Sequence, residues 1–493
     1  MNPLRKLASQ TVIYGLSSII GRFLNYLLVP LYTYTFPAQE YGIVSEFYAY
    51  AGFFAVLLVF GLETGFFRFS NREELRSDTV YSTALVFLIL ANLAFVSGIV
   101  VFREPLAALL RYSEHPEYLV WFGAILALDS ISALPFAKLR SENRAWRFAG
   151  IKLIEIVLAI GLNLFFLVYC KKAEELWPNS LGARLYDPAI GVGYIFLANL
   201  AASAFKLLLL MPQFKSLRHG LDSRLLKSLL AYSLPMVVIG FAGMVNEMLD
   251  RAILKFLLPY DLATNLRMLG IYGACYKLSI LMSLFIQAFR YAGEPFFFAY
   301  AGRADAKRAY ALVMNYFVIF CVFIFLVVTL YIDVFKYFVG VEYREGLHVV
   351  PVLLLANLFL GIYVNLSIWY KLTDRTLMGA WVSLIGAALT IGLNIWWIPI
   401  MGYMGSAWAT LACYATMTVI SYALGQYYYP VRYPLGKIVG YLLLGLLLYG
   451  GHKDLVESCG LTSWTVGTAF LGLYLLIVAL VDMRPMLRKR QPA

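Results

Sequence analysis

Charged residues are scarce in this chain of 493 residues: Asp, Glu, Lys and Arg make up 14% of it, whereas apolar residues make up 61%. The mean hydropathy is accordingly high, at +0.75. Too little polar surface remains to cover a soluble globule, so we expect membrane hydrocarbon to surround most of the protein. Cysteine and histidine are also rare, with five and four residues. None of them has the spacing of a disulfide framework or of a metal site.

Room for a soluble catalytic domain is lacking too. The longest connection on the predicted outer side, near residues 170–188, is short, and the chain contains no Walker phosphate loop. We therefore predict a protein that is not an enzyme and that has no catalytic residue, no metal and no cofactor.

Long apolar runs dominate what is present. A helix that spans the bilayer needs roughly 20 apolar residues, and windows of that length predict about 14 transmembrane helices. They lie near residues 11–34, 43–67, 79–102, 118–137, 148–169, 189–211, 229–256, 268–293, 309–332, 347–370, 376–398, 404–426, 435–451 and 463–481. The predicted fold class is an all-α integral membrane protein. The first segment lacks a signal-peptide cleavage pattern, so we expect it to be retained as a helix.

The connections between these segments differ in charge from one side of the membrane to the other. If both termini are cytoplasmic, most Lys and Arg residues fall in cytoplasmic segments, whereas more of the acidic residues fall outside. The formal net charge of +12 therefore reflects topology, and we predict no nucleic-acid partner.

The chain also matches itself at one fixed offset. Tyr41-Gly42 falls on Tyr272-Gly273, and Ile160-Gly161-Leu162-Asn163 falls on Ile391-Gly392-Leu393-Asn394. Upstream the register slips by two residues and pairs Arg22 with Arg251. Internal repeats in membrane chains are typical of transporters whose binding site lies between the two halves.

Each predicted half contains an even number of helices, so the two halves enter the membrane in the same sense. We predict two pseudosymmetric six-helix lobes, at residues 1–215 and 216–430. Residues 431–493 then form two additional helices and a basic tail.

Charged side chains inside the predicted helices are the strongest functional signal, because each costs on the order of 2.5–3.5 kcal/mol at the bilayer centre. The basic side chains inside these helices are equal in number to the acidic ones, as expected if they simply pair with one another. Two groups of these charged residues have a local explanation. The residues of the first are spaced for contact along one helix, and those of the second lie close enough to helix ends for their side chains to snorkel to water. The first group is Glu247, Asp250, Arg251 and Lys255, and the second is Lys152, Glu155 and Lys206.

Arg22 has no carboxylate within reach on its own helix, and the repeat gives it a symmetry mate in Arg251. Guanidinium groups bind phosphate oxygens bidentately and stay charged. We therefore predict a pyrophosphate-binding cavity that contains Arg22 and Arg251, with Lys277 and Lys255 as further candidates. Salt bridges that only brace the two halves are the alternative.

The acidic residues suggest ion coupling or gating. Glu46, Glu247, Asp250 or Asp129 could bind H⁺ or Na⁺, although Asp129 could equally be a hydrogen-bonded structural acid. Near the predicted cytoplasmic end of their helices lie Arg290, Glu294 and Glu63, which we interpret as an inner gate or as a structural latch.

Several motifs resemble a known family. They are Gly21-Arg22, Pro30-Leu31-Tyr32-Thr33, Glu40-Tyr41-Gly42, Asp250-Arg251 and Gly402-Tyr403-Met404-Gly405-Ser406-Ala407. Together they resemble the bacterial polysaccharide flippases of the multidrug/oligosaccharidyl-lipid/polysaccharide exporter superfamily. This resemblance implies two lobes that alternate between inward and outward openings and move a polyprenyl-pyrophosphate-linked oligosaccharide across the cytoplasmic membrane for cell-surface polysaccharide synthesis.

The resemblance further implies a monomer in the bacterial cytoplasmic membrane, in contact with membrane lipids and with other proteins of polysaccharide assembly. A drug or cation antiporter of the same superfamily and a peptidoglycan-precursor flippase are the alternatives. The arginine-rich first helix of the precursor flippases is missing, since only Arg22 lies there. A membrane glycan polymerase or ligase is a weaker alternative, because it usually needs a large outer loop.

Overall fold

The computed structural model describes residues 19–73, 75–459 and 462–483, and within these ranges the regular structure is entirely helical. Among the described residues, twelve helices are long and apolar enough to cross a membrane, and the count rises to thirteen if a bent pair of helices is one span. These spans coincide with all the predicted ones after the first. The predicted helix 11–34 begins outside the described residues, and the chain is helical from residue 19 onwards. The protein is therefore a multi-pass membrane protein.

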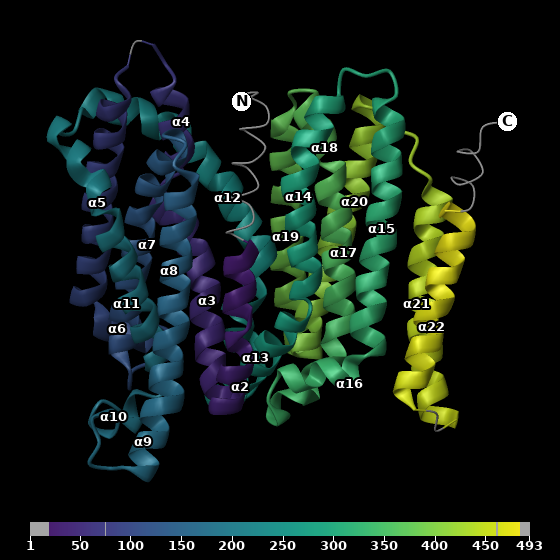
Figure 1. Cartoon of the computed structure of the whole chain (residues 1–493), viewed down its shortest axis with the longest axis horizontal. Coiled ribbons are helices and arrows are strands. Elements are labelled where there is room, and N and C mark those ends of the chain that lie inside the picture. The colour runs from purple at the N-terminus through teal and green to yellow at the C-terminus, as the bar shows by residue number, and fades with distance from the viewer. Residues whose placement is uncertain (1–18, 74, 460–461, 484–493) are drawn as a thin grey trace. The chain divides into compact units, whose positions relative to one another are not determined.

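The helices form two compact units, residues 1–255 and 256–493 (Figure 1). The first contains α2 Leu28–Thr35, α3 Ala38–Val59, α4 Leu62–Ser70, α5 Ser77–Val101, α6 Arg103–Leu109, α7 Pro116–Ser141, α8 Ala145–Leu164, α9 Lys171–Leu176, α10 Leu181–Arg184, α11 Gly193–Leu210 and nearly all of α12 Ser223–Leu257. The second contains α13 Leu262–Leu278, α14 Ile280–Tyr300, α15 Ala306–Leu330, α16 Ile332–Phe335, α17 Val350–Leu366, α18 Ile368–Leu372, α19 Thr376–Met401, α20 Tyr403–Tyr428, α21 Leu435–Cys459 and α22 Ser463–Val478. The predicted division into 1–215, 216–430 and 431–493 concerns the sequence repeat and stays a prediction.

Shorter segments of other helix types connect or extend these helices. They are the 3₁₀ segments η2 Pro188–Ile190, η3 Met211–His219, η4 Lys336–Phe338 and η5 Val341–Val349, and the π segments η1 Phe165–Cys170 and η6 Ala479–Met483.

The two units repeat the same packing. In the first unit α7 packs against α5 and α11, and α8 packs against α11. In the second unit α17 packs against α15 and α20, and α19 packs against α20. At the offset of the sequence repeat, α5, α7 and α8 fall on α15, α17 and α19. α11 does not fall on α20 at that offset, but the two helices make the same contacts in their units. The internal repeat is therefore present in the packing as well as in the residues.

One turn shows the repeat at atomic detail. Asn143 and Asp374, which are repeat mates, both adopt the left-handed backbone conformation, with φ of 58° and 55°. Arg144 N donates to the Leu139 carbonyl at 2.9 Å, and Arg375 N donates to the Tyr370 carbonyl at 2.8 Å. Asn and Asp tolerate this conformation better than most residues, so each can end one helix and start the next in the same way.

One span in each unit is interrupted, and these are the spans predicted at 43–67 and 268–293. In the first unit Phe60 and Gly61, with φ of 53° and 65°, separate α3 from α4. In the second unit α13 and α14 meet at Ser279 with a bend of 48°. Both breaks lie within apolar runs, so hydropathy alone does not reveal them.

Two glycines allow α4 to approach α12 closely. A Cβ at Gly61 would lie 2.8 Å from the Ser233 carbonyl oxygen, and one at Gly65 would lie 2.5 Å from Ser233 Oγ. Small residues at this spacing permit close helix packing, which is their role at Gly61 and Gly65. Gly436 and Gly440 have the same spacing in α21, but a Cβ at either would meet no atom within 4 Å.

We predict that Gly65→Leu lowers the stability of the protein by about 1–3 kcal/mol or more, because overpacking forces α4 away from α12. The matched substitution Gly440→Leu should leave stability nearly unchanged. The measurement is thermal unfolding of both purified variants in detergent. Equal melting temperatures for the two variants would contradict the close contact at Ser233.

Candidate functional site

A buried ion pair joins α3 to the end of α12. Lys255 Nζ lies 2.8 Å from Glu46 Oε2, and both side chains are 0% exposed. An ion pair that leaves water loses several kcal/mol of hydration for each ion, so further hydrogen bonds are needed to offset the cost. The sequence had paired Lys255 with charges on its own helix; instead its closest carboxylate belongs to another helix.

Two tyrosines and one carbonyl complete this cluster, which we call the Glu46 cluster. Tyr112 donates its hydroxyl hydrogen to Glu46 Oε2 at 2.5 Å, and Tyr50 donates to Oε1. Lys255 Nζ donates to the Leu110 carbonyl at 2.7 Å and lies 4.1 Å from the centre of the Tyr112 ring. Both carboxylate oxygens are therefore occupied by donors, and the lysine charge is neutralised.

Tyr112 lies between two spans, in the turn after α6. Burial first, and the Glu46 carboxylate next, raise the pKa of the Tyr112 phenol well above its ordinary value. Tyr112 therefore keeps its proton and remains a donor to Glu46. Neither tyrosine was predicted from the sequence. Tyr50 could have been found from its position four residues after Glu46, whereas nothing local points to Tyr112.

A second cluster, which we call the Lys206 cluster, joins three helices of the first unit. Lys206 of α11 lies 2.7 Å from Asp129 of α7 and 2.6 Å from Glu155 of α8. Ser203 also donates to Asp129, at 2.6 Å. The expectation that Lys206 snorkels to water is wrong, because its side chain is only 6% exposed and held between two acids. Asp129 has the hydrogen bonds of a structural acid.

The predicted gate residues form one ion pair in each unit. Glu63 of α4 pairs with Arg140 of α7. Glu294 of α14 lies 2.5 Å from Lys371 of α18. Glu63 and Glu294 are repeat mates, and so are Arg140 and Lys371. Both pairs are partly exposed, so each stabilises by at most about 1 kcal/mol and chiefly sets how two helix ends meet.

Arg290, by contrast, is exposed and lies four residues before Glu294. The four-residue spacing of Arg290 and Glu294 suggested a pair along one helix. In the structure, Glu294 instead forms its ion pair with Lys371 of another helix. A role of these residues in gating stays a prediction.

The remaining predicted residues differ widely in exposure. Arg22 and Glu247 are exposed, Lys277 is half-buried near the end of α13, and Asp250 is buried. Arg251 is 6% exposed. Its guanidinium donates to the Glu247 carbonyl and to Met248 Sδ at 3.2 Å, and Nε lies 3.4 Å from Asp250 Oδ1. Arg22 and Arg251 both belong to residues 1–255, and phosphate binding by them stays a prediction.

The sequence of this chain can be placed in a family. Residues 7–301, more than half of the chain, match the family described as polysaccharide biosynthesis protein. The chain belongs to this family. The matched region contains the Glu46 cluster, the Lys206 cluster and every residue that the sequence analysis singled out for binding or gating.

Relatives of this family member cover almost its whole length. The chain is 21% identical over 471 residues to the probable low-salt glycan biosynthesis flippase Agl15 of Haloferax volcanii. This match covers 94% of this chain and 93% of the relative. Its fold is similar to that of the lipid II flippase MurJ in an inward closed conformation, with a TM-score of 0.66 and 14% identity over 96% of this chain and 99% of that one.

A multidrug resistance MATE family transporter of the MOP superfamily, in an inward-facing conformation, is also similar. The TM-score is 0.62 and the identity 12%, over 85% of this chain and 94% of that one. These two similarities show that the polysaccharide biosynthesis family member shares its fold with both structures.

We predict that Lys255→Met and Glu46→Gln each destabilise the protein by about 3–5 kcal/mol, because each leaves a buried partner uncompensated. The double variant should recover much of that loss. The measurement is a double-mutant cycle of thermal unfolding in detergent.

The matched control is the exposed pair Lys453 and Glu457, whose side chains are 63% and 65% exposed. Lys453→Met and Glu457→Gln should change stability by less than about 1 kcal/mol. Additive effects of Lys255→Met and Glu46→Gln would show that the buried pair contributes no coupling energy.

Proposed function

We propose that this protein is a flippase that moves a polyprenyl-pyrophosphate-linked oligosaccharide from the inner to the outer leaflet of the membrane by alternating access. The observation that carries this proposal is the match along nearly the whole chain to a probable glycan biosynthesis flippase, together with membership of the polysaccharide biosynthesis family. The protein acts as a transporter rather than as an enzyme.

The duplicated packing supports this function. In many transporters with internal repeats, one half rocks against the other around a fixed site and exposes that site to each side of the membrane in turn. The ion pairs Glu63–Arg140 and Glu294–Lys371 give each copy the same connection between helix ends. Each copy is therefore suited to move as a body.

Within the proposed mechanism, Arg22 and Arg251 bind the pyrophosphate of the substrate, and Lys277 contributes a further positive charge. Guanidinium groups suit this task because they hold two phosphate oxygens at once. Arg251 is already oriented by the Glu247 carbonyl and by Asp250. Lys255 has a different role in this scheme, since it neutralises Glu46.

Coupling to H⁺ or Na⁺ is the second part of the proposal. Glu46 has both carboxylate oxygens occupied, so it can accept a cation only when Lys255 or a tyrosine moves away. A conformational step that opens this pair would therefore create a cation site, and cation binding would favour the open arrangement. Glu247, Asp250 and Asp129 remain further candidates.

The proposed setting is the bacterial cytoplasmic membrane, with both termini in the cytoplasm and with the protein acting as a monomer. The lipid-linked glycan and membrane lipids are its partners, and other membrane proteins of polysaccharide assembly deliver or receive the substrate.

We predict that Arg22→Ala strands lipid-linked glycan on the inner leaflet and lowers the flipping rate by about 10- to 100-fold, because a charged hydrogen bond is worth about 1.5–3 kcal/mol. Arg251→Ala should act in the same direction. The measurement is leaflet-resolved accumulation of lipid-linked intermediates in cells.

Arg224→Ala is the control, because Arg224 is exposed at the start of α12 and has no proposed role. Membrane insertion should be unchanged in all three variants. Normal glycan display combined with altered drug tolerance in the Arg22 variant would instead favour a drug antiporter.

We further predict that collapsing the H⁺ and Na⁺ gradients together slows transport of the lipid-linked glycan into vesicles, because the return of the empty carrier loses its bias. Collapsing each gradient alone identifies the ion. An unchanged rate after both are collapsed would remove ion coupling, and with it the proposed role of Glu46, from the mechanism.

A further inference from the structure

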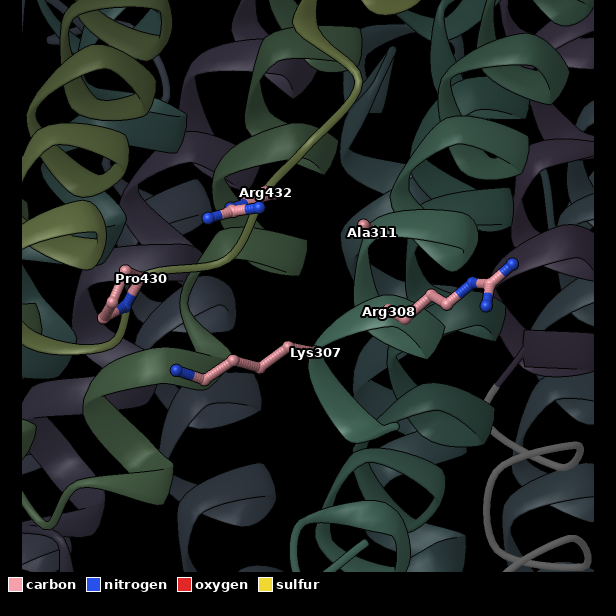
Figure 2. Close-up of a pocket in the computed structure, with 5 residues that line it drawn as sticks. All are labelled: Lys307, Arg308, Ala311, Pro430 and Arg432. Atoms are coloured by element: carbon pink, nitrogen blue, oxygen red, sulfur yellow. The ribbon is translucent and has the colours of Figure 1, made fainter. Parts of the chain in front are cut away.

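A basic pocket lies in the second unit and shares no residue with the charged clusters described above. It has a volume of about 530 Å³ and is lined by Lys307, Arg308, Ala311, Pro430 and Arg432 (Figure 2). Lys307, Arg308 and Ala311 belong to the first two turns of α15, and Pro430 and Arg432 belong to the connection between α20 and α21. The proposed flipping mechanism uses none of these residues.

The charge of the pocket has one sign. Three of its five lining residues are cationic and none is acidic. In Figure 2 the side chains of Lys307 and Arg432 extend toward the side of Pro430, whereas Arg308 points the opposite way. Within the described part of the chain, neither Lys307 nor Arg432 forms an ion pair with a carboxylate. Lys307 Nζ lies 4.8 Å from the centre of the Tyr429 ring, which leaves its donors available to a ligand.

The walls of the pocket are anchored to a packed core. Val431, which lies between Pro430 and Arg432, is buried together with Phe297, Ala306, Tyr310 and Ile368. Gln426 Nε2 donates to the Val431 carbonyl at 2.7 Å, and Tyr310 donates to the Phe297 carbonyl at 2.8 Å. The backbone of the connection is therefore held in place, and only the side chains of the pocket have to be ordered at the moment of binding.

The position along the helices places the pocket at the membrane surface. α15 begins at Ala306, α20 ends at Tyr428 and α21 begins at Leu435, so three spans have an end here. Tyr429 and Tyr433 lie in the same connection, and tyrosine is typical of the interface between lipid headgroups and water. The positive charges predict that this side faces the cytoplasm.

We propose that this pocket binds the phosphate of a lipid headgroup at the membrane surface. Basic pockets between transmembrane helices bind anionic headgroups because the lipid tail stays in hydrocarbon while Lys and Arg hold the phosphate. The same chemistry fits two sources, a resident anionic phospholipid and the polyprenyl pyrophosphate carrier. The inference does not depend on the proposed flippase function, because it concerns binding at one unit alone.

The test measures lipid retention by the purified full-length chain, using native mass spectrometry after release from nanodiscs. One arm uses phosphatidylglycerol mixed with phosphatidylcholine, and a second uses undecaprenyl pyrophosphate in phosphatidylcholine. The variant Lys307→Ala/Arg432→Ala should weaken retention of the phosphate ligand by about 30-fold, which corresponds to ~1 kcal/mol for each of the two cations.

The control is Arg224→Ala/Lys227→Ala, which removes the same charge from two exposed residues of α12. It should retain both ligands as wild type does. Loss of phosphatidylglycerol alone in the pocket variant assigns the site to a phospholipid, and loss of undecaprenyl pyrophosphate alone assigns it to the carrier. Loss of both assigns it to the shared phosphate. Retention of both at wild-type levels overturns the proposal, and so does an equal loss in the control.

Discussion

Charge inside the membrane is the constraint on which the structure depends. An ionised side chain at the bilayer centre costs on the order of 2.5–3.5 kcal/mol, so a helix that contains one is stable there only if something neutralises it. In the first unit the partners come from different helices: Lys255 of α12 pairs with Glu46 of α3, and Lys206 of α11 lies between Asp129 of α7 and Glu155 of α8. Each cluster thus cross-links helices that are far apart in the chain. These contacts hold the helices of the first unit together.

The two halves share their scaffold but differ at their buried charges. The ion pair Glu63–Arg140 recurs as Glu294–Lys371, and the turn at Asn143 recurs at Asp374. Glu46, in contrast, has a residue of opposite charge, Lys277, as its repeat mate. Its hydrogen-bond donor Tyr112 is matched by another tyrosine, Tyr343. The two halves therefore share their helix-end contacts and differ in the charge that each places at this repeat position. The proposed cation-dependent step at Glu46 would belong to the first half alone.

Most of the fold could be predicted from the sequence, because apolar run length and the repeat are properties of the chain itself. The breaks at Phe60-Gly61 and Ser279 could not, since both interrupt continuous apolar runs. For the candidate site, the sequence identified Glu46, Lys255, Asp129 and Lys206 as charges inside the membrane. It could not identify their partners, because depth along a helix does not say which face a side chain occupies. Lys206 shows the difference: its position near a helix end suggested water, whereas two acids on neighbouring helices hold it.

The central claim is that this duplicated bundle transfers a lipid-linked glycan between leaflets by itself. The most direct measurement uses purified protein in liposomes that contain a polyprenyl-pyrophosphate-linked oligosaccharide, with a glycan-cleaving enzyme added outside. If the protein flips this substrate, substrate from the inner leaflet becomes accessible to the enzyme in proteoliposomes and stays protected in protein-free liposomes. Equal protection in both would contradict it.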